Sequence, residues 1–356
     1  MKSLRYESRM AEKAKALREK GHAVILAVES SCDETAIAIV EDGRIERANA
    51  IASQIDIHAL YGGVVPEIAS RMHVEAIDPL LEKALEEANM TMEDIDAVAV
   101  TYGPGLVGAL LTGVSWAKAF AYARDLPLIP VNHIEGHVSA NYVAHPELEP
   151  PFVCLVASGG HSHIVAVDHY GQYRLIGQTT DDAAGEAFDK CGKLLGLKYP
   201  AGATISRLGK DGNRKFVDFP RALHVHDNCE FSFSGLKTAV LRYTETHDPE
   251  FIQKSLGDIC ASLEDAIVDS LVTKTITALK KTKMKTLVVG GGVSANAWLR
   301  TRLQDYCDKH GIMFCIPERS LSTDNGAMIA AAAIRRKLQG KLVSVNEVKP
   351  WMPLAL

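Results

Sequence analysis

The sequence lacks long apolar runs and paired cysteines. In its 356 residues, no stretch reaches the roughly 18–20 consecutive apolar residues that a membrane-spanning helix needs. The N-terminus has no apolar segment before a small-residue cleavage site, so we expect neither membrane association nor secretion but a cytoplasmic location. The seven cysteines form no Cys-x-x-Cys motif, and this odd, scattered set favours reduced thiols over disulfides or a cysteine-type zinc site.

An excess of positive charge is also missing, because the formal net charge is −5. The N-terminus is the exception: residues 1–22 hold seven basic and three acidic side chains, which leaves +4 there and −9 in the remainder. We treat these residues as a basic N-terminal extension. A solvated helix is the simpler interpretation of the extension, and a nucleic-acid-binding arm is the alternative.

A strand–turn–strand unit occurs twice along the chain. Residues 24–40 contain two strand-like apolar runs joined by the polar turn SSCDET, and residues 152–167 repeat this order around SGGH, about 130 residues later. Each copy precedes further segments that are typical of βα units. The repeat predicts an α/β protein with two similar lobes around a cleft. This is the duplicated actin-like ATPase fold of the actin/Hsp70/sugar-kinase (ASKHA) superfamily, in which such turns can aim N–H groups at phosphates.

The same organisation predicts the domain boundaries. We expect the first lobe at residues 23–131 and the second at residues 132–324. The final helical segment, within residues 325–356, is expected to pack back on the first lobe.

The pair His133-x-x-x-His137 is a candidate metal site. On a helix, residues four apart lie on one face, so both imidazoles can reach one ion. The motif HIEGH also invites comparison with the HExxH metalloproteases. That comparison fails, because Glu135 follows His133 by two residues and therefore lies about 200° round the helix from it. We exclude a peptidase of this type.

Asp324 is the candidate third ligand, although it has a simpler explanation as the N-cap of the helix that follows. Two histidines and one carboxylate leave coordination positions open, which suits Fe(2+) or Zn(2+). His161 and His163 share a strand face and form an alternative metal pair that we rank lower.

Three further segments are candidate ligand-binding or catalytic elements. Val156–Gly160 has paired glycines that let a ligand approach the backbone, and a plain hairpin turn is its alternative. Gly290–Asn296 reads as a strand, a glycine loop and a helix start, where phosphates bind and where Asn296 suits a ribose or adenine contact. Asp33 and Glu34, in the first turn, are either turn-forming residues or a general base.

Nine motifs in register resemble the TsaD (Gcp, "O-sialoglycoprotein endopeptidase") family of tRNA N6-adenosine threonylcarbamoyltransferases. The resemblance covers about residues 24–353. The motifs are ESSCDET (29–35), YGGVVPEIASR (61–71), GPGLVGALL (103–111), HIEGH (133–137), SGGH (158–161), DDAAGEAFDK (181–190), FSFSGLKT (231–238), GGGVSAN (290–296) and STDNGAMIA (322–330).

The resemblance implies an activity and a set of site residues. Family members transfer a threonylcarbamoyl group from threonylcarbamoyl-AMP to N6 of the adenosine just 3′ of the anticodon, in tRNAs reading codons that begin with A. It implies one divalent metal, with Fe(2+) favoured and Zn(2+) possible, on His133, His137 and Asp324. The implied adenylate contacts are Val156, Ala157, Ser158, Gly159, Gly160, Asp189, Gly202 and Asn296.

The resemblance also implies partners. Bacterial members work with tRNA, with a catalytically empty TsaB-like paralogue and with a small TsaE-like ATPase. The basic residues Arg207, Lys210, Arg214, Lys215 and Arg221, or the N-terminal extension, are candidate tRNA contacts.

The sequence departs from the family pattern in three places. Residues 1–22 precede the usual start, Ala201 stands where the loop often has glycine, and Ser30 stands where threonine is common. The alternative functions are a sugar kinase, a metal-dependent carbamoyltransferase that acts on a small metabolite, and a non-catalytic scaffold. The complete ligand set argues against the scaffold, and HIEGH with a distant TDNG argues against the kinase.

Overall fold

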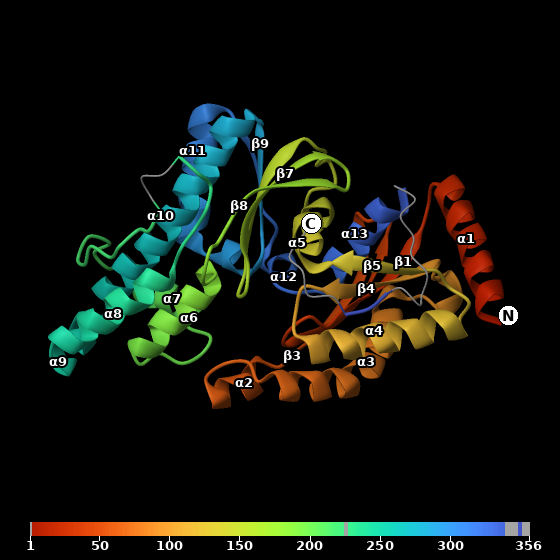
Figure 1. Cartoon of the computed structure of the whole chain (residues 1–356), viewed down its shortest axis with the longest axis horizontal. Coiled ribbons are helices and arrows are strands. Elements are labelled where there is room, and N and C mark those ends of the chain that lie inside the picture. The colour runs from red at the N-terminus through yellow and green to blue at the C-terminus, as the bar shows by residue number, and fades with distance from the viewer. Residues whose placement is uncertain (1, 224–226, 339–347, 351–356) are drawn as a thin grey trace. The chain divides into compact units, whose positions relative to one another are not determined.

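The protein forms two compact α/β units. A computed structural model describes residues 2–223, 227–338 and 348–350 (Figure 1). Unit 1 comprises Met1–Leu148 with Thr323–Leu356, and unit 2 comprises Glu149–Ser322.

The sheet of unit 1 has the strand order β3-β2-β1-β4-β5. β1 pairs antiparallel with β2 and parallel with β4, so it is the central strand, and its uninterrupted VILAVE sequence is buried throughout. Asp42 and Gly43 turn the chain between β2 and β3 with φ angles of 53° and 67°, as expected for an Asp-Gly hairpin turn. The strands are β1 (Val24–Glu29), β2 (Glu34–Glu41), β3 (Ile45–Ser53), β4 (Ala97–Gly103) and β5 (Leu128–Asn132).

Helices cover both faces of this sheet (Figure 1). Val24, Leu26 and Val28 of β1 join one core cluster with residues of α3 and α4. α13 packs on β1, β2 and α5. The helical segments are α1 (Lys2–Lys20), α2 (Ile55–Tyr61), α3 (Pro66–Ala88), η1 (Met92–Asp94), α4 (Val107–Ala123), α5 (His133–Ala144) and α13 (Gly326–Leu338).

The sheet of unit 2 repeats the order and directions of unit 1, as the duplication in the sequence predicts. Its order is β10-β9-β6-β7-β8, with β6 antiparallel to β7 and parallel to β9. The strands are β6 (Phe152–Ala157), β7 (Ser162–His169), β8 (Gln172–Gln178), β9 (Thr286–Gly290) and β10 (Met313–Cys315).

The long helix α10 organises the core of unit 2. Its apolar residues form one buried cluster with β6, β9, α6, α8 and α11, and it lies beside α6–α8 in Figure 1. The helical segments are α6 (Ala184–Leu194), α7 (Gly202–Leu208), α8 (Ser234–Thr246), α9 (Pro249–Lys254), α10 (Leu256–Thr282), η2 (Gly292–Ala295), α11 (Ala297–His310) and α12 (Arg319–Ser322).

The division into units differs from the predicted lobes at two boundaries. Thr323 and Asp324, which we expected at the end of the second lobe, belong to unit 1. The first lobe was expected to end at residue 131, whereas the first segment of unit 1 ends at Leu148. The reason is α5, which packs extensively on α13 and therefore belongs to unit 1. The helices in the described part of the chain are too short or too polar to span a bilayer.

Candidate functional site

Two histidines of unit 1 face the same point because α5 begins immediately after β5. The side chain of Asn132 caps the helix by accepting hydrogen bonds from the amides of Ile134 (2.9 Å) and Glu135 (3.3 Å). His133 and His137 are then one turn apart, with ring centroids 4.6 Å apart. Both rings are buried.

Asp324 lies against both histidines. Its Oδ1 is 3.7 Å from Nε2 of His133 and 3.3 Å from Nε2 of His137. The capping function considered for Asp324 belongs to its neighbour Asn325, whose Oδ1 accepts a hydrogen bond from the Met328 amide (3.0 Å). His133, His137 and Asp324 form a group that could hold a metal ion, with ligand atoms within 4.8 Å of one another.

The surroundings of His137 fit a metal ligand. The ring is fully buried, yet among the described residues neither ring nitrogen has a hydrogen-bond partner. Nε2 approaches Oδ1 of Asp324 without hydrogen-bond geometry. Burying a polar nitrogen without a partner costs free energy, whereas a lone pair directed at a cation needs no donor. The donor set of two imidazoles and one carboxylate suits Fe(2+) or Zn(2+).

His133 is oriented by a buried carboxylate that the sequence analysis did not single out. Its Nδ1 lies 3.1 Å from Oγ of Ser31 and 3.4 Å from Oε2 of Glu29, so Nε2 is left to face Asp324. Glu29 ends the apolar strand β1 and is 0% exposed. Glu29 could have been singled out from the sequence, because it is a lone acidic residue at the end of an otherwise apolar strand.

The charges in this group are strongly coupled. Burial lowers the pKa of His133, but the carboxylates of Asp324 and Glu29 outweigh burial and raise that pKa to about 9. Burial alone would raise the pKa of Glu29, yet the charge of His133 prevails and lowers it.

The turn acids Asp33 and Glu34 lie close enough to this group to be influenced by it. Burial, followed by the charges of Asp324 and Asp33, raises the pKa of Glu34 to about 9. Glu34 also accepts a hydrogen bond from Oγ of Ser53 (3.2 Å). A carboxyl with this pKa is protonated at neutral pH, so Glu34 is better suited to donate a proton than to accept one.

The predicted adenylate segments meet one another within unit 2. The amide of Ser158 donates to the carbonyl of His161 (2.8 Å), which closes the SGGH turn. Gly291 has a φ of 86°, and a Cβ there would lie 2.4 Å from the carbonyl oxygen of Ala157. The GGGVSAN loop therefore lies directly against the end of β6. At Gly159 and Gly160 a Cβ would meet nothing within 4 Å, so the backbone is open to a ligand there.

Asp189 and Gly202 belong to the same assembly. Oδ1 of Asp189, on α6, accepts a hydrogen bond from the Ala201 amide (2.7 Å) and so holds the loop that leads into Gly202. The alanine at 201, where glycine was expected, keeps this backbone contact because its side chain is not involved in the bond.

Asn296 stabilises the loops around the predicted adenylate segments. Its Oδ1 accepts from the Leu299 amide (2.9 Å) and caps α11. Its Nδ2 donates to Oγ of Ser206 (2.9 Å) and to Oε1 of Glu264 (2.8 Å). Both amide hydrogens are thereby used, which leaves one acceptor lone pair for a ligand.

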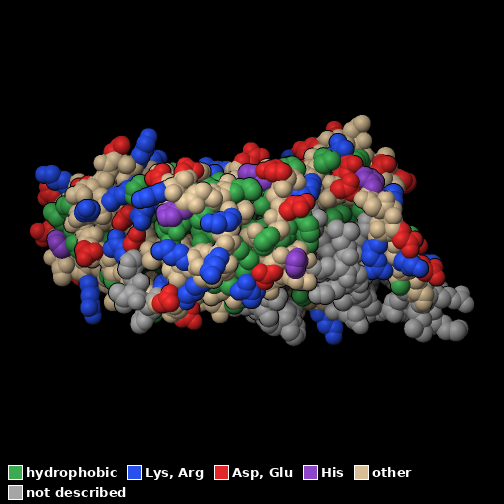
Figure 2. All heavy atoms as spheres, turned by 90° about the horizontal axis from the view of Figure 1, so that it is seen from above, with side chains coloured by type: hydrophobic (Ala, Val, Ile, Leu, Met, Phe, Trp, Pro, Cys, Tyr) green, Lys and Arg blue, Asp and Glu red, His purple; other side chains and the backbone are tan. Residues whose placement is uncertain are grey.

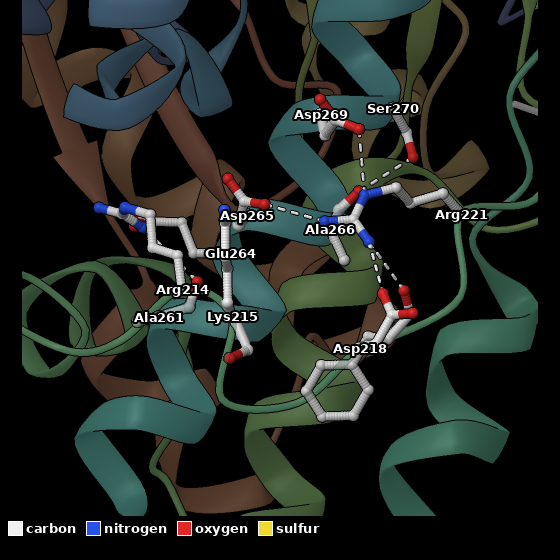
Figure 3. Close-up of polar contacts among 12 residues, drawn as sticks. Arg214, Lys215, Asp218, Arg221, Ala261, Glu264, Asp265, Ala266, Asp269 and Ser270 are labelled. Atoms are coloured by element: carbon white, nitrogen blue, oxygen red, sulfur yellow. Dashed lines mark hydrogen bonds and ion pairs between the residues drawn. The ribbon is translucent and has the colours of Figure 1, made fainter.

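Two of the basic residues considered for tRNA are engaged with acids of α10 (Figure 3). Arg214 donates to Oε2 of Glu264 (2.7 Å), the same carboxylate that holds Asn296. Arg221 contacts Asp265 (2.8 Å) and Asp269 (3.0 Å). These side chains hold the 209–222 segment on α10.

The alternative pair His161 and His163 does not form a metal group in the described part of the chain. The two rings are stacked with centroids 5.6 Å apart. Burial lowers the pKa of His163 to about 4.

His22, Glu41 and Asp42 form another group of possible metal ligands in the described part of the chain. One of its carboxylates already has a structural role, because Asp42 accepts a hydrogen bond from the Ala23 amide (2.8 Å).

Comparison with known proteins agrees with the motif pattern. Residues 46–331 match the family model described as "TsaD: tRNA N6-adenosine threonylcarbamoyltransferase". The chain is 52% identical over 332 residues to the enzyme of that name from Clostridium perfringens (strain SM101), which covers 93% of this chain and 98% of the relative. It is 50% identical over 322 residues to the enzyme of the same name from Clostridium botulinum (strain Hall).

Solved structures with low sequence identity share the fold. HypF from T. kodakarensis aligns with a TM-score of 0.61 at 12% identity, over 89% of this chain and 48% of that one. The activator of 2-hydroxyisocaproyl-CoA dehydratase from Clostridium difficile aligns with a TM-score of 0.52 at 13% identity, over 90% of this chain and 97% of that one.

Proposed function

The chain belongs to the tRNA N6-adenosine threonylcarbamoyltransferase family, and on that premise we propose how its residues carry out the reaction. The protein is an acyltransferase that forms threonylcarbamoyladenosine in tRNA, so the alternative of a carbamoyltransferase acting on a small metabolite is set aside. We propose threonylcarbamoyl-AMP as the donor and AMP as the leaving group.

We propose that His133, His137 and Asp324 hold one divalent metal, with Fe(2+) favoured over Zn(2+). The observation that carries this proposal is His137, a buried imidazole on which neither nitrogen has a hydrogen-bond partner among the described residues. When bound, the metal supplies a Lewis acid for the threonylcarbamoyl end of the donor. Glu29 and Ser31 hold the ring of His133 so that its Nε2 faces Asp324.

The turn acids are proposed to handle the proton of the acceptor amine. N6 of the adenosine attacks the carbamoyl carbon, the bond from that carbon to the AMP phosphate oxygen breaks, and AMP leaves with the electron pair. The proton lost from N6 passes to the carboxylate of Asp33. Glu34, whose pKa is raised to about 9 by burial and by the charges of Asp324 and Asp33, is proposed as a hydrogen-bond donor instead. The general-base role is thereby assigned to Asp33 alone.

The adenylate is proposed to lie on the glycine-rich segments of unit 2. The space where a Cβ of Gly159 or Gly160 would lie holds no other atom within 4 Å, and we propose that the phosphate of the adenylate occupies it. Val156 and Ala157 are buried at the end of β6, so they support the turn from below, and Ser158 closes it through the hydrogen bond of its amide to the His161 carbonyl. Asp189 and Asn296 support the proposal indirectly, because they hold the loops on either side through the bonds to Ala201 and Ser206. Gly202 follows the first of these loops.

A direct assay tests the proposed function. The protein is incubated with threonylcarbamoyl-AMP, unmodified tRNA and its partner proteins, and the nucleosides are analysed by mass spectrometry. We expect the modified adenosine with the wild-type protein and none with His137→Ala, which should also lose its metal by elemental analysis. His145→Ala, just beyond the end of α5 and outside the metal group, is the control and should keep both. Full activity of His137→Ala would contradict the metal assignment.

We propose that a TsaB-like paralogue docks on the outer face of α4. Val107, Leu111 and Tyr122 are more than half exposed there and recur at helical spacing, and Val74 of the adjacent α3 is 65% exposed. Exposed apolar side chains that gather on one side of a helix are typical of a protein–protein interface. A TsaE-like ATPase is proposed as a further partner on the basis of the family alone.

We propose that the protein acts in the cytoplasm. Its tRNA substrate supports a compartment that contains tRNA, and its seven scattered cysteines, which form no Cys-x-x-Cys motif, fit a reducing one. Recovery of the native protein in a secreted fraction would contradict this proposal.

A further inference from the structure

The turn that carries Asp33 and Glu34 is held at three successive carbonyl groups. The carbonyl of Ser31 accepts a hydrogen bond from the Leu106 amide (2.7 Å), that of Cys32 from Nε2 of His73 (3.0 Å), and that of Asp33 from the Gln54 amide (3.0 Å). These donors come from three different segments, namely the start of α4, the middle of α3 and the start of α2. The backbone path of the turn is therefore set by its surroundings.

The ring of His73 has a defined protonation state in this arrangement. Nε2 faces the carbonyl of Cys32, which can only accept, so Nε2 carries the proton. Nδ1 is then the acceptor for the hydroxyl of Thr35, 2.7 Å away. Both side chains are 0% exposed, and burial lowers the pKa of His73, which favours the neutral ring. His73 thus ties together the two ends of the segment Cys32–Thr35.

A second histidine supports the third anchor. The Val65 amide donates to Nδ1 of His58 (3.2 Å), so Nε2 of that ring donates to Oε1 of Gln54 (3.1 Å). Gln54 in turn holds the carbonyl of Asp33 through its backbone amide. The α2–α3 segment, which includes the motif YGGVVPEIASR, thus supplies two buried histidines of fixed tautomer. One of them is bonded to the turn and the other to Gln54.

We infer that His73 is a positioning residue for the transfer reaction, which it serves by fixing the path of the turn that carries Asp33. Of the three donors on the turn carbonyls, two are backbone amides that any residue except proline supplies, whereas the third is the side chain of His73. Substitution at this residue therefore removes an anchor that the backbone cannot replace. The inference rests on the proposed function of Asp33 as the proton acceptor.

His73→Phe tests the inference by keeping a ring but removing both hydrogen bonds. A displacement of the acid by about 1 Å is enough to lower kcat by about 100-fold. We expect a fall in kcat of this order, a KM for threonylcarbamoyl-AMP within about threefold of wild type, and an unchanged metal content. His73→Gln can donate to the Cys32 carbonyl through its amide and should recover kcat to within about tenfold of wild type.

Ile77→Ala provides the matched control on the same helix. Ile77 lies one turn beyond His73, is 1% exposed and packs in the core of unit 1 without contacting the turn through hydrogen bonds. It should lower the melting temperature but leave kcat of the folded protein unchanged. Thr35→Val, which removes only the hydroxyl that orients the ring, serves if His73→Phe does not fold, and it should lower kcat by about tenfold.

The outcomes separate the inference from the proposed function. Wild-type kcat in folded His73→Phe, or in Thr35→Val where His73→Phe does not fold, would overturn the inference. So would a loss of kcat that His73→Gln does not recover, or that Ile77→Ala shows equally. If the wild-type protein itself forms no modified adenosine, or if Asp33→Asn retains full activity, the proposed function fails instead.

Discussion

At the scale of single residues, the two histidines of HIEGH have different surroundings. The ring of His133 is held at Nδ1 by Glu29 and Ser31, whereas neither nitrogen of His137 has a hydrogen-bond partner among the described residues. The ring of His133 is therefore oriented before any ligand binds, whereas the ring of His137 has no hydrogen bond among the described residues that fixes its orientation. The carboxylate of Glu29 is the group whose removal should reveal this difference.

Glu29→Gln should weaken metal binding without unfolding the protein. The substitution keeps the volume of the side chain but removes the charge that holds the ring of His133 through Nδ1. Loss of such an outer partner lowers metal affinity by about 10–100-fold. Metal titration of the apoprotein measures the effect. Glu41→Gln, in a surface pair with Arg47, is the control and should bind metal as wild type does. Unchanged affinity in Glu29→Gln would show that Ser31 alone orients the ring.

His163 should make the stability of unit 2 depend on pH. Its pKa is about 4 in the folded protein because of burial, against about 6.5 in the unfolded chain. The unfolded chain therefore takes up the proton first, so stability is complete above about pH 6.5 and falls as the pH drops toward 4.

The size of this effect can be measured by urea unfolding at pH 7.5 and 4.5. The shift corresponds to a loss on the order of 2 kcal/mol from this residue. His163→Gln should remove that part of the pH dependence, while His169→Gln, at the exposed end of the same strand, should leave it unchanged. Equal pH dependence in wild type and His163→Gln would refute the assignment.

At the scale of elements, α1 shows how the basic extension is used. Met10, Ala14 and Leu17 recur at helical spacing and are buried. Arg9 and Lys13 both pair with Asp125. One face of α1 is therefore packed on unit 1, and two of its basic side chains pair with an acid. These contacts favour a surface helix, the simpler interpretation of the extension, over a nucleic-acid-binding arm.

Leu17→Ala should therefore destabilise the protein while leaving tRNA binding unchanged. Truncating a buried leucine costs about 2–3 kcal/mol, which lowers the free energy of unfolding. Double replacement of Arg9 and Lys13 by glutamine should cost about 1 kcal/mol or less, because the pairs are on the surface. Filter binding with tRNA provides the second measurement. A large loss of tRNA affinity in the double variant, with stability intact, would favour the nucleic-acid-binding arm.

At the scale of the whole molecule, the two units share one topology but carry different groups. Unit 1 has the metal group, the turn acids and the apolar face of α4, whereas unit 2 has the open glycine-rich turn. Side chains of the two kinds of charge are spread over the face seen in Figure 2, in keeping with a net charge of −5. The exposed apolar residues of α4 are the surface that we propose for the partner protein.

Leu111→Glu should prevent association with the TsaB-like paralogue. Leu111 is 53% exposed on α4, and a carboxylate buried in an apolar interface is costly. Light scattering after size-exclusion chromatography should show a complex with the wild-type protein and separate chains with the variant. Leu175→Glu, at a residue 44% exposed on β8 of unit 2, is the matched control and should still associate. A complex that survives Leu111→Glu would place the partner elsewhere.

Much of the fold could be predicted because it depends on local patterns. The duplicated strand–turn–strand units and the Asp42-Gly43 turn both follow from residue order over a few positions. The lobe boundary was less accurate, because the placement of α5 depends on its packing with α13 and not on its own sequence.

By itself, the sequence determined which residues share a face and which segments turn. His133 and His137 meet because a helix repeats every 3.6 residues, and this holds in any tertiary context. Only the tertiary structure decided that Asp324 faces them while Asn325 caps α13, that Glu29 orients His133, and that His73 holds the turn of Asp33. These contacts join segments far apart in the chain. They depend on how buried surfaces pack, and no local periodicity encodes that.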